Sequence, residues 1–111
     1  MVGVNETWGS WFAYRAVLLT DSEFATTPPQ RGTSPCVSCA TSPCLAACPG
    51  GALAGGFRLE SCVAYRKAPG SVCRNTCVAR LACPVASQHR YTDQQLAHSY
   101  SRSMSWLERR G

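Results

Sequence analysis

Eight cysteines constrain this chain more than any other feature, because all of them lie within residues 36–83. They fall into two groups of similar order: Cys36-x2-Cys39-x4-Cys44-x3-Cys48-Pro49, and Cys62 followed by Cys73-x3-Cys77-x5-Cys83-Pro84. Each group ends in Cys-Pro, so the sequence contains two degenerate copies of one cysteine motif. Eight cysteines in 111 residues is about 7%, a density typical of small domains that cross-links or metals hold together.

The cysteines are better suited to binding metal than to forming disulfide bonds. Disulfides need an oxidising compartment, and the first residues, 1–7, contain neither the basic nor the apolar part of a secretory signal. The longest apolar run, residues 11–19, is interrupted by Arg15 and is too short to cross a bilayer. We therefore expect a cytoplasmic protein without a membrane segment, whose clustered cysteines bind metal. Four disulfide bonds are the alternative.

The order of the cysteines favours two [4Fe–4S] clusters. Each cube takes four thiolates, and in two-cluster ferredoxins the cysteine before proline binds the cluster of the other group. This rule divides the eight residues without remainder. The first cluster would be held by Cys36, Cys39, Cys44 and Cys83, and the second by Cys48, Cys62, Cys73 and Cys77. Zinc is the competing metal, but only Cys36 and Cys39 have the Cys-x2-Cys spacing of a structural zinc site. A single cluster with spare cysteines is a further alternative.

These motifs resemble those of a known family. Residues 36–52, from Cys36-x2-Cys39 to Cys48-Pro-Gly-Gly-Ala, are similar to the ferredoxin signature that ends in Cys-Pro-x-Gly-Ala. Residues 58–65 resemble the segment that carries a lone fifth ligand in epoxyqueuosine reductases, and reductive dehalogenases have a similar ferredoxin half. Residues 9–12 and 18–21 resemble the stretch that leads into the cluster domain of these reductases, so the resemblance extends over residues 9–85.

The resemblance implies electron transfer but not the family's catalysis. The cobalamin-binding and substrate-binding parts of these enzymes have no counterpart in the 111 residues, and the cysteine spacings here are longer than the family's. We expect a protein that is not an enzyme by itself and that relays electrons to a redox partner. One alternative is a cluster-bearing fragment or subunit of a cobalamin-dependent reductase, whose partner would be a cobalamin-binding domain. The other is a zinc-binding interaction module.

The rest of the sequence predicts a small α+β, ferredoxin-like dicluster domain. Residues 8–20 are aromatic and β-branched and apolar on both faces, which predicts a strand, so residues 1–35 form an N-terminal strand and a Pro/Gly linker. Residues 36–88 form the dicluster domain, with short helices that begin near Pro43, Ser61 and Thr76.

Residues 89–111 contain a C-terminal amphipathic helix, expected over 92–109. Thr92 and Gln95 fit a capping box at its start. Its apolar stripe comprises Leu96, Tyr100, Met104 and Leu107. We interpret this stripe as a surface that packs on the cysteine domain.

The chain is basic, with 11 Lys and Arg residues against 6 Asp and Glu residues and a formal charge of +5. A [4Fe–4S] cube with four thiolates carries a charge of about −2, so two cubes would bring the total to about +1. We interpret part of the basic excess as a balance for cluster charge. The arginines are too scattered to favour a nucleic-acid surface.

Overall fold

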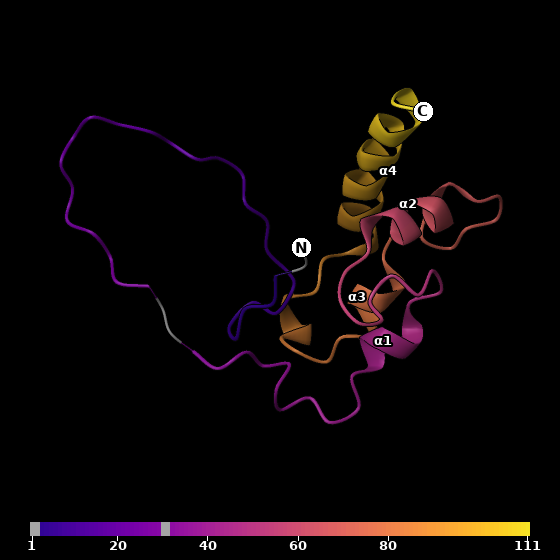
Figure 1. The fold of residues 1–111 in the computed structure, drawn as a ribbon, viewed down its shortest axis with the longest axis horizontal. Helices are drawn as coiled ribbons and strands as arrows, with labels where there is room; N and C mark the ends of the chain where they lie inside the picture. The colour runs from indigo at the N-terminus through magenta and orange to yellow at the C-terminus, as the bar shows by residue number, and fades with distance from the viewer. Residues whose placement is uncertain (1–2, 30–31) are drawn as a thin grey trace.

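The computed structural model describes residues 3–29 and 32–111. Its helices, in chain order, are α1 (Pro43–Ala47), α2 (Leu59–Lys67), α3 (Val78–Ala82), the 3-10 turn η1 (Ser87–His89) and α4 (Asp93–Arg109). Helix α1 packs against α3, and α2 packs against α4 (Figure 1). No helix in these two ranges is both long enough and apolar enough to span a membrane.

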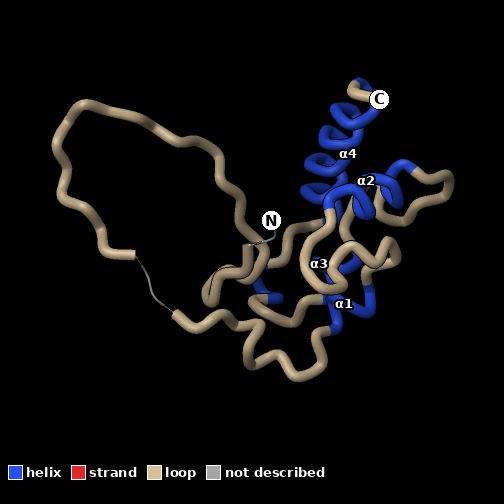
Figure 2. The backbone as a smooth tube through the Cα atoms, in the orientation of Figure 1, coloured by secondary structure: helices blue, strands red, loops and turns tan. Residues whose placement is uncertain are grey.

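The predicted strand over residues 8–20 is wrong. Within the described residues, the only β-bridge is an isolated pair between Asn5 and Gly9, and residues 11–20 have no regular structure. Residues 13–29 are exposed along their whole length. Arg15 still lies beside the start of α4, and the chain that follows it forms a wide loop away from the helices (Figure 2). A strand needs a partner to bond with, and the described chain offers none to this segment. The strand part of the predicted α+β, ferredoxin-like class is therefore not supported, and the domain is small and mostly helical.

The residues before this loop are docked on the segment that follows α3. Trp11 is only 4% exposed, and the guanidinium of Arg80 lies 4.4 Å from its ring centre and 4.9 Å from that of Tyr91. Gly9 has a φ of 60°, and a Cβ at this position would lie 2.6 Å from the carbonyl oxygen of Val85. Only glycine accommodates both the left-handed backbone and this close approach.

The loop returns to the place where it began. A Cβ built on Gly32 would lie 3.1 Å from a carboxylate oxygen of Glu6, so the two ends of the excursion are neighbours.

The short helices begin close to the predicted positions. Pro43 occupies the first turn of α1, as expected, whereas α2 begins at Leu59 and so precedes the predicted Ser61. The N-cap of α3 is Cys77 and not Thr76. Helices α1 and α3 both end at a cysteine that precedes proline, which places the two copies of the Cys-Pro motif in equivalent positions.

The helix expected over residues 92–109 is confirmed, because α4 spans Asp93–Arg109. The N–H of Gln95 donates to Oγ1 of Thr92 at 3.2 Å, and the N–H of Thr92 donates to Oε1 of Gln95 at 2.9 Å, which completes the capping box. Leu96 and Met104 of the apolar stripe are each 2% exposed, so this face packs inward.

The apolar core of the described residues is small. Its buried members are Trp11, Ala52, Cys73, Ala79, Leu96 and Met104. Half of these side chains are alanine or cysteine, which bury little apolar area. A domain with so little core generally depends on a metal or on cross-links for its stability.

Candidate metal centre

Helix packing brings cysteines from the two sequence groups together. Helix α1 carries Cys44 and ends at Cys48, while Cys77 and Cys83 bound α3 on its two sides. Because α1 packs against α3, thiols that lie far apart in the sequence become neighbours. All eight cysteines are free thiols.

Four of the thiols line one cavity of about 390 Å³ whose wall is mostly apolar. They are Cys48, Cys62, Cys73 and Cys77. Burial raises the pKa of the Cys62 thiol above 9.0, and the charges of the other three raise it further, whereas Arg66 acts in the opposite direction. A positively charged metal centre among these four thiols would oppose the effect of burial and favour the Cys62 thiolate.

A second group of thiols lies outside this cavity. Burial raises the pKa of Cys44, and the neighbouring charge of Cys83, followed by the weaker effect of Cys36, adds to the shift. The N–H of Cys39 donates to the carbonyl of Cys36 at 3.3 Å, so these two residues share one turn. Cys36 is exposed, which places one edge of this group at the protein surface.

The structure thus groups Cys62 with Cys48, Cys73 and Cys77, and it groups Cys44 with Cys36 and Cys83. Their role as cluster ligands stays a prediction. In residues 3–29 and 32–111, no three His, Cys, Asp or Glu side chains gather closely enough to hold a single metal ion. A [4Fe–4S] cube takes one thiolate at each iron, so its ligands surround a cavity and do not converge on one point.

Two polar groups near the cavity fit an anionic cluster. The N–H of Ala52 donates to Sγ of Cys48 at 3.4 Å, a type of bond that tunes cluster potentials. Oγ1 of Thr76 is buried at the cavity wall and has no hydrogen-bond partner among the described residues. An unpartnered buried hydroxyl costs about 1–3 kcal/mol, and a sulfur atom in the cavity would serve as its acceptor. The residues that line the cavity are therefore compatible with a [4Fe–4S] cluster.

Sequence reasoning missed Thr76 as part of this site and did not single out Arg66. It treated Thr76 as a helix cap, and it treated Arg66 as one of several basic residues whose excess charge partly balances the clusters. Arg66 follows Cys62 by four residues in α2, and this spacing on one helix face was the available signal. No such local signal exists for Thr76, because its position at the cavity follows from tertiary packing.

Comparison with known protein families, with curated proteins and with solved structures gives no match to this chain. The function proposed below therefore depends on the cysteines and on the geometry of the cavity.

Proposed function

We propose that this chain is an iron–sulfur protein that carries two [4Fe–4S] clusters and relays electrons to a redox partner. The observation that supports this proposal best is the cavity lined by four thiols, whose wall also holds an unpartnered hydroxyl. Cys48, Cys62, Cys73 and Cys77 would hold the cluster in the cavity. Cys36, Cys39, Cys44 and Cys83 would hold the other. The clusters would supply one-electron redox chemistry.

The chain's own residues would hold and shield the clusters. The apolar cavity wall, which includes Phe57 and Leu107, would keep water from the cluster. The Ala52 N–H would stabilise the charge on the Cys48 sulfur. Because the apolar core is small, the clusters would also act as internal cross-links between the short helices. We place such a protein in the reducing cytoplasm, where thiols are available for cluster assembly.

A second candidate function is that of an electron-transfer subunit of a cobalamin-dependent reductase. The exposed loop favours it, because Tyr14 is 91% exposed, Leu18 is 89% exposed and Leu19 is 96% exposed. Contiguous apolar side chains at this level of exposure are typical of interaction surfaces. Replacing Leu18 and Leu19 together by Ser should abolish co-purification with a cobalamin-binding domain while the iron content is unchanged. Unchanged co-purification would argue against this surface as the docking site.

The main proposal is tested by metal analysis after purification without oxygen. We expect about eight irons and eight acid-labile sulfides per chain. In a matched pair of variants, Cys62→Ser and Cys44→Ser, each should lose a different cluster and keep about four irons. Zinc without sulfide would refute the proposal in favour of an interaction module. Loss of all iron from both variants, or of none from either, would refute the division of ligands.

A further inference from the structure

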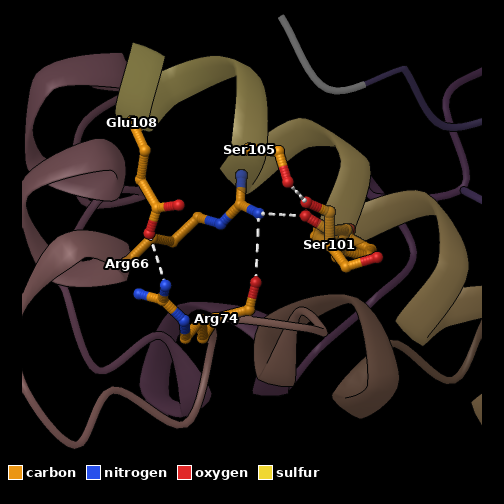
Figure 3. Close-up of polar contacts among 6 residues, drawn as sticks. Arg66, Arg74, Ser101, Ser105 and Glu108 are labelled. Atoms are coloured by element: carbon orange, nitrogen blue, oxygen red, sulfur yellow. Dashed lines mark hydrogen bonds and ion pairs between the residues drawn. The ribbon is translucent and has the colours of Figure 1, made fainter. Parts of the chain in front are cut away.

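A buried arginine lines the same cavity as the four thiols. Arg66 is 8% exposed. Its Nε donates to the carbonyl of Cys73 at 3.2 Å, and its Nη1 donates to Oγ of Ser103 at 3.1 Å. Its Nη2 donates to the carbonyls of Arg74 at 3.3 Å and Tyr100 at 3.0 Å. Figure 3 shows the guanidinium between α4 and the segment that carries Arg74.

The charge of Arg66 has no anionic partner in the described part of the chain. All four of its acceptors are neutral oxygens. The only ion pair within 4.0 Å among the described residues joins Arg74 to Glu108, so the carboxylate drawn beside Arg66 already has a cationic partner (Figure 3). A buried charge without a counter-ion is strongly unfavourable. The positive charge therefore points to a negative occupant of the adjoining cavity.

We infer that Arg66 is the counter-cation of the cluster held by Cys48, Cys62, Cys73 and Cys77, and that its charge makes this cluster easier to reduce. The inference rests on the proposed function. On accepting one electron, from an electron-donor protein or from the chemical titrant, a cube with four thiolates would change its charge from about −2 to about −3. A nearby positive charge stabilises the more negative state more strongly, so it raises the reduction potential.

A purely structural role for Arg66 makes a different prediction. Its guanidinium also ties α2 to α4 and to the loop before α3, so a variant can fail through the lost hydrogen bonds alone. Lysine keeps the charge but cannot reproduce the planar fork of donors. Comparing Arg66→Gln with Arg66→Lys therefore separates charge from hydrogen bonding.

The test is an anaerobic redox titration of the cluster-loaded chain, followed by electron paramagnetic resonance. In Arg66→Gln, one of the two midpoint potentials should fall, with the equilibrium constant for reduction lower by about tenfold, or about 59 mV for one electron. In Arg66→Lys, most of the potential should be retained. The control is Arg15→Gln, which removes an exposed charge that does not line the cavity and should shift neither potential.

Unchanged potentials in Arg66→Gln, or equal falls in Arg66→Gln and Arg66→Lys, would overturn the inference. If Arg66→Gln loses a cluster, iron analysis decides: retention of that cluster in Arg66→Lys supports the counter-cation, and equal loss in both variants overturns it. A wild-type chain without iron or sulfide would refute the proposed function itself, and the inference with it, before any variants are compared.

Discussion

Gly50 lies where the turn after Cys48 meets α2, and alanine at this position should disturb the four-thiol cavity. A Cβ on residue 50 would lie 2.9 Å from Cβ of Tyr65 and 3.3 Å from the carbonyl oxygen of Ser61. Ordinary carbon contacts are about 3.5–4.0 Å. Both neighbouring atoms are attached closely to the backbone of α2, so neither can move without the helix. The Gly50→Ala change must therefore separate the turn from α2.

The expected cost follows from this overlap. Inserting a methyl group into a packed contact typically costs about 1–3 kcal/mol. For a urea dependence of about 2 kcal/mol per molar, a loss of 2 kcal/mol lowers the unfolding midpoint by about 1 M. The same displacement moves Cys48 away from Cys62, so the iron content should fall from about eight toward four per chain.

Urea unfolding followed by far-ultraviolet circular dichroism, combined with iron analysis, measures both effects. The matched control is Gly51→Ala, where a Cβ meets nothing within 4 Å but φ is 58°. This control should lose about 1–2 kcal/mol through backbone strain alone and keep its iron. A Gly50→Ala chain with the wild-type midpoint and full iron would refute the steric reasoning.

Two further predictions concern what holds the helices in place. Removing iron with a chelator should abolish the cooperative unfolding transition and reduce the helical signal, because α1 and α3 have only five residues each and are too short to persist alone. An iron-free chain that unfolds at the wild-type urea concentration would contradict this role of the clusters. Thr92→Ala should lower the free energy of unfolding by about 1 kcal/mol through loss of the α4 cap, as measured by urea titration. An unchanged free energy would show that the cap contributes nothing in this context.

Elements with local signals could be predicted from the sequence, and elements that depend on distant partners could not. The capping box of Thr92 and Gln95 and the position of Pro43 follow from interactions within one turn of helix. The strand over residues 8–20 failed because its composition describes a segment buried in a sheet, whereas a sheet also requires a neighbour that the described chain does not supply.

The candidate site also has some features that the sequence predicts and others that depend on tertiary packing. The grouping of Cys62 with Cys48 and Cys77 could be anticipated from cysteine order, because the Cys-Pro motif predicts which ligands cross between groups. The buried charge of Arg66 and the unpartnered hydroxyl of Thr76 depend on how α2, α3 and α4 pack. The periodicity of apolar residues in the sequence does not predict how these helices pack together.

The meeting of Glu6 and Gly32 makes the intervening loop a point of insertion. Glu6 and Gly32, on either side of the loop, are already neighbours, so a longer loop need not change how the helices pack. The entropy of closing a loop grows slowly, by about 0.6 kcal/mol for each doubling of length. An entire folded module can therefore replace residues 13–29 at small cost, provided that its own termini lie close together. The contact between Trp11 and Arg80 would then hold the start of the inserted module beside the cysteine domain.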